Sequence, residues 1–194
     1  MIKKIKEEIK HSINIKQKIL NNDKLLDDIK NLSITAANCL KNGGKIILCG
    51  NGGSFADAQH ISAEFTSKLR FDRDSLPAIT LGTNSSSLTA IGNDYNFDQI
   101  FKRELSSLYK PEDLFIPIST SGRSSNIIEA IKFAKTKNLT TIGLTGNKGG
   151  DMNRYCNVIC IPSDMTEKIQ ESHIMIGHIV CSIVENILFK NVNN

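Results

Sequence analysis

The chain has 194 residues, of which 40% are hydrophobic and 23% are charged, and its net charge is +4. Length and composition fit one globular domain that folds without disulfides or a structural metal, and they exclude disordered, collagen-like and fibrous chains. Aromatic residues make up only 6% of the chain, and the basic residues are scattered. A nucleic-acid surface combines a basic patch with stacking aromatics, so we expect no nucleic-acid partner.

The cellular location is predicted from what the sequence lacks. No apolar run approaches the ~20 residues of a membrane span, and residues 1–8 contain no apolar core of a secretory signal. The five cysteines are an odd number, which indicates a reducing compartment. We therefore expect a cytoplasmic protein with no membrane partner. Cys156 and Cys160 have no second cysteine pair near them, so we interpret both as buried small hydrophobic residues and not as metal ligands.

The N-terminal segment, residues 1–42, is predicted to form two helices. Isoleucines recur every three or four positions along one face of the first helix, at Ile2, Ile5, Ile9 and Ile13. The run Asn21-Asn22-Asp23 offers an N-cap for the second helix, and Gly43-Gly44 ends it. We expect this pair to pack on the domain and on partner subunits; the alternative is that it only covers its own core.

From residue 45 onward, short apolar runs alternate with helical stretches. The predicted strands are 45–49, 77–81, 114–118, 141–144 and 158–161. The predicted helices between and after them are 54–68, 84–91, 97–109, 124–137 and 165–190. Strands without polar alternation are buried on both faces. The fold class is therefore α/β: a doubly wound, mainly parallel five-stranded sheet with helices on both faces, in a single domain over residues 1–194.

Two loops follow predicted strands and precede predicted helices. The first, Gly50-Asn51-Gly52-Gly53-Ser54, is rich in glycine, and Ser54 is expected to be the N-cap of its helix. The second, Ser119-Thr120-Ser121-Gly122-Arg123-Ser124, brings several hydroxyls and free N–H groups to a helix N-terminus, which is a cradle for a phosphate dianion. One hydroxyl suffices to cap a helix, so capping alone does not explain this loop. Ligands of open α/β sheets bind at this edge.

Neither loop has the pattern of a nucleotide-binding loop. No Gly-Lys-Ser/Thr follows them, and neither is a Gly-x-Gly-x-x-Gly sequence with an acidic residue about 20 positions later. We therefore expect no nucleotide cofactor and predict a phosphorylated small molecule as ligand.

Two groups of titratable residues lie near these loops. His60 and Glu64 are four residues apart and share one helix face, where they could bind a metal, act as acid and base, or be a plain surface pair. His173 and His178 point in different directions from the last helix. Gln170 and His178 are separated by about 12 Å along a straight helix. One site therefore uses both only if two subunits supply them or the helix is irregular, which favours an interfacial site.

The chain resembles a known family in a set of short motifs that occur in order. These are Cys49-Gly50-Asn51-Gly52-Gly53-Ser54, Asp57-Ala58-Gln59-His60 with Glu64, Ala90-Ile91-Gly92-Asn93-Asp94-Tyr95, Ile118-Ser119-Thr120-Ser121-Gly122, Leu144-Thr145-Gly146 with Gly149-Gly150, and Ile169-Gln170-Glu171-Ser172-His173 with His178. Together they are similar to the sugar-isomerase (SIS) domain proteins, and specifically to the bacterial phosphoheptose isomerases. The resemblance covers nearly the whole chain.

This resemblance implies an SIS-type fold and a homotetramer with active sites between subunits. It also implies conversion of sedoheptulose 7-phosphate to D-glycero-D-manno-heptose 7-phosphate, the first step of nucleotide-activated heptose biosynthesis for lipopolysaccharide, capsule or other glycans. Aldose–ketose isomerisation moves a proton between C1 and C2 through an ene-diol, and it needs a base near one carbon and an acid at the neighbouring oxygens.

The resemblance also implies roles for individual residues. Glu64 and His178 would be the catalytic pair, and either of the two could be the base. Ser54, Ser119, Thr120, Ser121 and Ser124 would hold the phosphate, and Asn51, Gly52, Gly53, Asn93, Asp94 and Gln170 would contact the substrate. Some members carry zinc, for which the corresponding ligands here are His60, Glu64, Gln170 and His178. A metal-bound Glu64 would be a weaker base, so its two roles compete.

Two departures from the family pattern affect substrate contacts. Ser67-Lys68 stands where many members have Gly-Arg, and lysine does not replace a bidentate arginine. The stretch 82–85 lacks an acidic residue often found there.

Two other functions compete with this interpretation. The first is a non-catalytic SIS tetramer that binds the replication initiator, against which the presence of both Glu64 and His178 argues. The second is an SIS isomerase for another sugar phosphate, which the loops alone would allow and a substrate panel would separate.

Overall fold

The computed structural model of the chain describes residues 1–190. Its elements are α1 (Ile2–Leu20), α2 (Asp23–Lys41), β1 (Ile46–Cys49), α3 (Gly53–Thr66), β2 (Ala78–Thr80), α4 (Ser85–Asp94), the short 3-10 helix η1 (Phe97–Gln99), α5 (Ile100–Leu108), β3 (Leu114–Ser119), α6 (Ser125–Thr136), β4 (Thr140–Thr145), the 3-10 helix η2 (Gly150–Arg154), β5 (Asn157–Cys160), α7 (Thr166–Glu185) and a π-helical turn η3 (Asn186–Lys190). The predicted alternation of strands and helices is confirmed.

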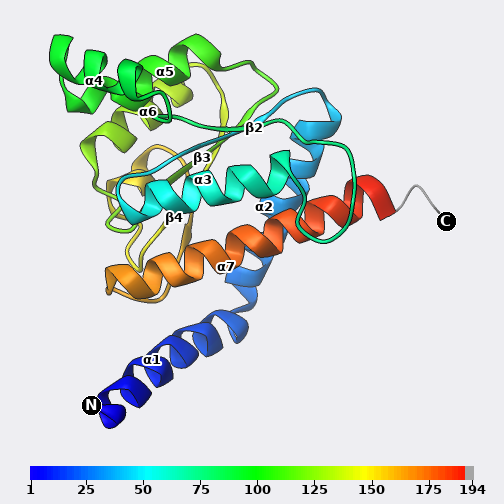
Figure 1. Cartoon of the computed structure of the whole chain (residues 1–194), viewed down its shortest axis with the longest axis vertical. Coiled ribbons are helices and arrows are strands. Elements are labelled where there is room, and N and C mark those ends of the chain that lie inside the picture. Colours follow the sequence, from blue (N-terminus) through cyan, green and yellow to red (C-terminus); the bar gives the residue numbers. More distant parts are fainter. Residues whose placement is uncertain (191–194) are drawn as a thin grey trace.

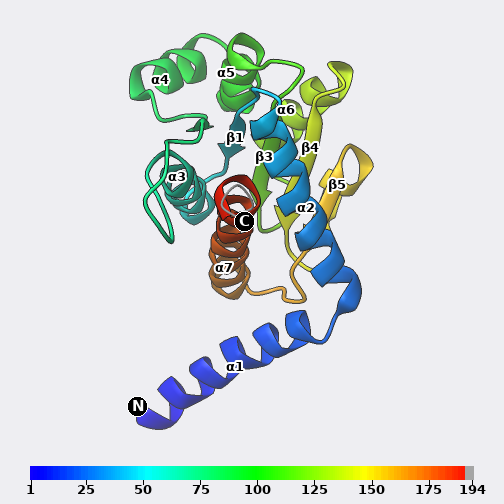
Figure 2. The same ribbon diagram turned by 90° about the vertical axis from the view of Figure 1, so that its right-hand side faces the viewer.

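The five strands form one sheet in the order β2-β1-β3-β4-β5, and every neighbouring pair is parallel. Alternate side chains of β1 enter two different hydrophobic clusters. Ile46 and Leu48 pack with α2, α3 and α7, whereas Ile47 and Cys49 pack with α5 and α6. Figure 2 shows these two helical layers on either side of the strands. The predicted doubly wound α/β fold is confirmed.

The two N-terminal helices differ in how they pack. The side chains of α2 that face the sheet are buried, including Leu25, Ile29 and Leu32. In contrast, α1 extends away from the body of the molecule, and only Ile15 and Ile19 near its end are buried (Figures 1 and 2). The predicted helical pair is present, but only α2 is part of the core along its length.

Some predicted helix boundaries are wrong for identifiable physical reasons. Ser54 is not an N-cap: it is the second residue of α3 and only 3% exposed, while Gly52 caps the helix with a φ of 55°. A positive φ of this kind favours glycine, so the backbone turn decides where the helix begins. The predicted helix 97–109 is interrupted, because η1 precedes α5. Asn22 does cap α2, since its side chain accepts a hydrogen bond from the Leu25 N–H.

Cys156 and Cys160 are less buried than predicted. Both are half-buried, and all five cysteines are unpaired. Burial raises the pKa of the Cys156 thiol to about 11, so this thiol is protonated at neutral pH and is a poor metal ligand.

The last helix satisfies the length and composition of a membrane span. Within residues 1–190, only the stretch Thr166–Lys190 does so. Figure 1 shows α7 lying beside α3 and crossing α2, and its buried side chains belong to the same hydrophobic cluster as those two helices. A core helix passes the same composition test, so no membrane role is assigned to α7.

A buried carboxylate fixes the amino-terminal edge of the sheet. Asp113, 1% exposed, accepts hydrogen bonds from the backbone N–H groups of Lys45 and Lys110 at 2.9 and 2.7 Å. Its other contact is an ion pair of 2.6 Å with the Lys45 ammonium. Asp113 therefore joins the chain before β1 to the chain before β3, at the edge opposite the two glycine- and serine-rich loops.

Replacing this carboxylate should lower stability. Asp113→Asn removes the charge that pairs with Lys45 and one acceptor for a backbone N–H, so we expect the free energy of unfolding to fall by about 2–4 kcal/mol. Denaturant titration measures the change. Glu129→Gln, in an ion pair with Lys132 whose side chains are 29% and 44% exposed, should cost less than about 1 kcal/mol. An equal fall in the free energy of unfolding in both variants would contradict the role of Asp113 in fixing this edge of the sheet.

Candidate active site

The two predicted loops lie next to each other at the carboxyl edge of the sheet. One joins β1 to α3 and the other joins β3 to α6, and β1 pairs directly with β3. The Asn51 and Asn126 side chains connect the loops through two reciprocal amide hydrogen bonds, each 2.9 Å. Asn126 is 1% exposed, and its side-chain Oδ1 also accepts a hydrogen bond from the Ile127 N–H. Sequence reasoning missed Asn126, although its amide sets the position of a predicted substrate residue.

The serine-rich loop has the shape of an anion cradle. Its backbone reverses at Gly122, whose φ of 63° favours glycine, and whose N–H bonds to the Ser119 carbonyl at 3.1 Å. The hydroxyls of Ser119 and Ser124 lie 3.0 Å apart, with Ser124 at the N-cap of α6. The Ser124 side chain makes no capping hydrogen bond to the helix, so this hydroxyl is available to a ligand.

Three titratable side chains from two helices converge at the carboxyl-terminal half of α3. His60 and Glu64 come from α3, and the His60 Nε2 lies 3.0 Å from the Glu64 Oε1. His178 comes from α7, with its Nε2 3.2 Å from the same His60 nitrogen. Figure 1 shows α3 and α7 lying side by side. His60 is exposed, whereas Glu64 and His178 are half-buried.

This trio offers three ligand atoms to a shared cation. The His60 Nε2 faces both a carboxylate oxygen and a second imidazole nitrogen, and it carries at most one proton. A tetrahedral zinc with N and O ligands at about 2.0–2.1 Å places neighbouring ligand atoms about 3.3 Å apart. The two measured separations are close to that value, and the three ligand atoms lie within 4.8 Å of one another. The chemistry of His60, Glu64 and His178 therefore fits a zinc ion, and the two separations from the His60 Nε2 suit its geometry.

The structure places Gln170 away from this trio. An added Cβ at Gly53 would lie 2.5 Å from the Gln170 amide nitrogen, so Gln170 lies against the first residue of α3. The helix α7 is regular through both Gln170 and His178, which separates them by about 12 Å along its axis. One chain therefore does not bring Gln170 and His178 to one ion.

Two other predicted substrate residues also lie apart from the loops. Asn93 and Asp94 are exposed at the end of α4, where the Asn93 amide bonds to the Asp94 carboxylate at 3.0 Å. The helix α4 packs mainly on η1 and α5. Its link toward the serine-rich loop runs through η1, where the Asp98 carboxylate accepts a hydrogen bond from the Ser125 hydroxyl.

Asp57 adds a partly buried carboxyl to the same helix as His60. Burial raises the pKa of this group to about 6, and the nearby His60 opposes the shift. Its Oδ2 is buried and has no hydrogen-bond partner among the described residues. Asp57 is therefore neutral in part of the population near pH 6.

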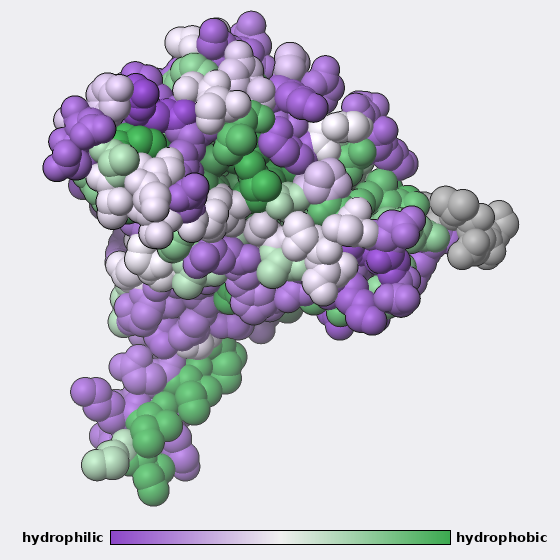
Figure 3. All heavy atoms as spheres, turned by 45° about the horizontal axis from the view of Figure 1, so that its top comes forward, coloured by the Kyte–Doolittle hydropathy of each residue, from purple (hydrophilic) through white to green (hydrophobic). Residues whose placement is uncertain are grey.

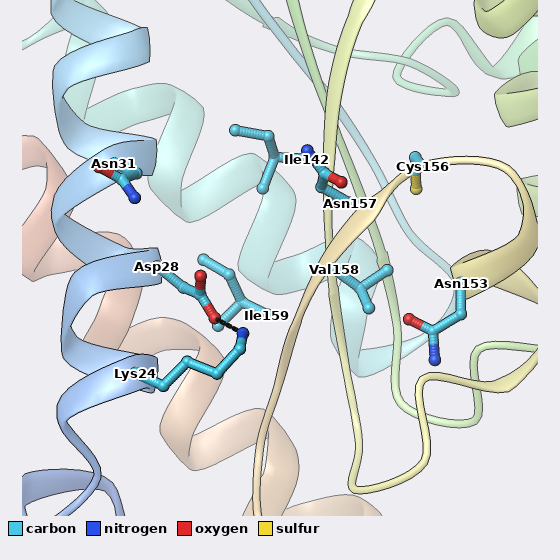
Figure 4. A pocket seen from close by; sticks show the side chains of 9 residues that line it. All are labelled: Lys24, Asp28, Asn31, Ile142, Asn153, Cys156, Asn157, Val158 and Ile159. Carbon is cyan, nitrogen blue, oxygen red and sulfur yellow. Dashed lines mark hydrogen bonds and ion pairs between the residues drawn. The ribbon is translucent and has the colours of Figure 1, made fainter.

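Of two hollows at the surface, only the second is bordered by predicted site residues. The first lies between α2 and the edge strand β5 and contains the Lys24–Asp28 ion pair (Figure 4). Figure 4 shows that its side chains come from α2 and the β4–β5 region, so it contains none of the predicted site residues. The second hollow is bordered by Thr120 and Ser121 of the serine-rich loop and continues toward the start of α7.

Comparisons with known proteins agree with this geometry. Residues 9–146, more than half of the chain, match the SIS domain family. The phosphoheptose isomerase of Aneurinibacillus thermoaerophilus is 50% identical over 188 residues, which cover 96% of this chain and 95% of that protein. The solved phosphoheptose isomerase of Neisseria gonorrhoeae has a TM-score of 0.88 and 37% identity, and covers 95% of this chain and 98% of its own. That of Francisella tularensis has a TM-score of 0.90 and 35% identity, with the same coverage. The chain belongs to the SIS-domain family and, within it, to the phosphoheptose isomerases.

His173 is buried behind the site and supports it. Its Nε2 lies 3.2 Å from the Thr145 carbonyl, and the next residue, Gly146, donates its N–H to the Thr120 carbonyl at 3.0 Å. The imidazole is fully buried, and its Nδ1 has no partner among the described residues. Burial lowers the pKa of His173 to about 4, although the Thr145 carbonyl opposes the shift. The neutral ring thus connects α7 to the loop after β4 and, through Gly146, to Thr120.

Acid should destabilise the fold through this residue. Because the folded pKa of His173 lies below its unfolded value of 6.5, the stabilisation is complete above pH 6.5 and is lost as the pH falls toward 4. The loss amounts to about 3 kcal/mol at most. Denaturant titrations at pH 7 and pH 4 measure it. His173→Gln has no titrating group at this position, so its stability should fall less over the same range, and an equal fall in both proteins contradicts this role.

Proposed function

We propose that this chain is an aldose–ketose isomerase that converts sedoheptulose 7-phosphate to D-glycero-D-manno-heptose 7-phosphate. One observation carries the proposal: a chain that is 50% identical to a phosphoheptose isomerase has both an anion cradle at the start of α6 and a His–Glu–His cluster between α3 and α7. The first feature suits a phosphate, and the second suits proton transfer at the other end of the same small molecule.

The substrate would be held mainly by hydroxyl and backbone N–H groups. Ser119, Thr120, Ser121 and Ser124 would bind the phosphate, supported by the nearly buried Ser54. Asn51, Gly52, Gly53, Asn93, Asp94 and Gln170 would contact the sugar chain. Asn51 is already oriented by Asn126, so this contact would be preorganised and its entropic cost low.

Proton transfer would use Glu64 and His178. Isomerisation removes a proton from one of the C1 and C2 carbons and returns it to the other, while a second group moves a proton between the two oxygens. A carboxylate and an imidazole on neighbouring helices can divide these tasks, and His60, 3.0 Å from Glu64, orients the carboxylate. This cluster also argues against a purely non-catalytic, initiator-binding role.

We further propose that the site takes up zinc, held by His60, Glu64 and His178. When bound, zinc would polarise the substrate carbonyl and stabilise negative charge on its oxygen. Gln170, the fourth ligand that the resemblance implies, would have to come from a second subunit, because a straight α7 does not bring it to the His178 of its own chain. A cytoplasmic location stays a prediction.

The active form is proposed to be a homotetramer in which α1 makes subunit contacts. Four isoleucines on α1 are more than half exposed: Ile2, Ile5, Ile9 and Ile13. Figure 3 shows a continuous green band along the projecting helix. An apolar helix face of this kind is stabilised when it packs against another apolar surface, and a second copy of the chain carries the same face.

The isomerase proposal is tested by proton NMR of sedoheptulose 7-phosphate in D2O. We expect an aldose phosphate that carries deuterium at C2, and at least about 100-fold lower rates for Glu64→Gln and His178→Gln. The matched controls are Glu129→Gln and His11→Gln, whose side chains lie elsewhere on the surface and which should keep the wild-type rate. The proposal would be wrong if the wild-type protein neither converts the substrate nor incorporates deuterium into it, with or without added zinc.

Two further arms of the experiment address metal and substrate. Loss of rate after treatment with a chelator, restored by zinc, is the expected result for the metal proposal; an unchanged rate contradicts it. Faster conversion of a pentose or hexose phosphate than of the heptose would instead identify an SIS isomerase for another sugar phosphate.

The assembly proposal is tested by light scattering after size-exclusion chromatography. Ile9→Asp places a charge in the middle of the exposed isoleucine band, so we expect the tetramer mass to fall to that of a smaller species. Lys4→Glu, which also adds negative charge to α1 but on another side of the helix, should leave the mass unchanged. Equal masses for wild type and Ile9→Asp would rule out α1 as the contact.

A further inference from the structure

A second connection between α3 and α7 lies beyond the candidate active site. Arg73, in the loop after α3, pairs with Glu185, the last residue of α7, at 3.1 Å, and both side chains are 1% exposed. The Glu185 carboxylate also accepts the backbone N–H groups of Leu69 and Arg70 at 2.9 and 3.0 Å. This one carboxylate therefore holds three donors from the loop that follows α3.

Arg73 in turn binds the carboxyl end of α3. Its Nη2 donates to the Glu64 carbonyl at 2.7 Å, and its Nη1 donates to the Phe65 carbonyl at 2.7 Å. The last carbonyls of a helix have no partner within the helix, and α3 has no basic residue in its last turn. The guanidinium supplies the missing donors, and a planar group with five N–H bonds can do so while it also pairs with Glu185.

The geometry relates this pair to the catalytic groups. Glu185 follows His178 by seven residues, close to two helical turns, so both project from one side of α7. Glu64 provides its side chain to the active-site cluster and its carbonyl to Arg73. Through these contacts, Arg73 and Glu185 connect the backbone of Glu64 to α7, the helix that carries His178.

Stability alone does not account for such a pair. Two buried charges pay a desolvation penalty, and well-packed apolar residues of similar volume are often as stabilising or more so. What the charges add is a defined geometry. Their hydrogen bonds fix the loop, the end of α3 and the end of α7 at set distances from one another.

We propose that Arg73 and Glu185 are positioning residues that set the separation of Glu64 and His178 for proton transfer. This inference rests on the proposed isomerase function of the same site. Neither residue touches the substrate loops, so both should act on the chemical step and not on phosphate binding. A misplacement of about 1 Å between reacting groups can lower a rate on the order of 100-fold.

The test compares Arg73→Lys and Glu185→Gln with Asp113→Asn. Asp113 is a matched control, because it also is a buried carboxylate that accepts two backbone N–H groups and one side-chain cation, but it lies at the opposite edge of the sheet. We expect kcat to fall roughly 10-fold to 100-fold in Arg73→Lys and Glu185→Gln, with KM and inhibition by inorganic phosphate within about 3-fold of wild type. The control should keep its kcat.

The double variant supplies an independent measurement. Since the two residues act as one unit, the kcat of Arg73→Lys/Glu185→Gln should equal that of the less active single variant. The fold-loss in kcat of the double variant should not be the product of the two single fold-losses. If Glu185→Gln unfolds, Glu185→Asp retains the charge and shortens the reach, and it carries the same expectation.

The outcomes separate this inference from the function on which it rests. Wild-type protein without isomerase activity overturns both. If the wild type is active and neither Arg73→Lys nor Glu185→Gln loses more kcat than Asp113→Asn does, the positioning role is overturned and the isomerase function still holds. A loss confined to KM, or a multiplicative double variant, also overturns it.

Discussion

The close contact between α3 and α7 is the constraint on which the candidate active site depends. It is possible because Gly177 has no side chain: an added Cβ would lie 2.5 Å from the Ile61 side chain. In the proposed mechanism Glu64 and His178 act on neighbouring atoms of one substrate, so they would cooperate only while the two helices stay this close. The cluster of His60, Glu64 and His178 is therefore a property of helix packing as much as of the residues themselves.

The parallel sheet provides the other half of the site. Every strand ends at the same edge, so loops that are about 70 residues apart in sequence become neighbours when β1 pairs with β3. The reciprocal amide pair of Asn51 and Asn126 fixes the distance between them. One edge of the sheet thus holds the proposed phosphate-binding groups, and the helices α3 and α7 hold the titratable groups.

Much of this arrangement could be predicted from local sequence patterns. Apolar runs identified the strands, and the spacing of His60 and Glu64 placed both on one helix face. Contacts between distant segments left no such signal: nothing in the sequence pairs Asn126 with Asn51, or Arg73 with Glu185. Ser54 was assigned to the wrong position because a serine before a helix usually caps it, whereas here the left-handed turn at Gly52 starts the helix earlier.

The two outer strands of the sheet have only three and four residues, β2 and β5. An outer strand presents unpaired backbone groups that can recruit a strand from another molecule, and a short one offers few of them. The sheet is therefore a poor template for edge-to-edge aggregation. The proposed association between copies would instead use helical surfaces, such as the isoleucine face of α1, where side chains and not backbone groups decide which partner fits.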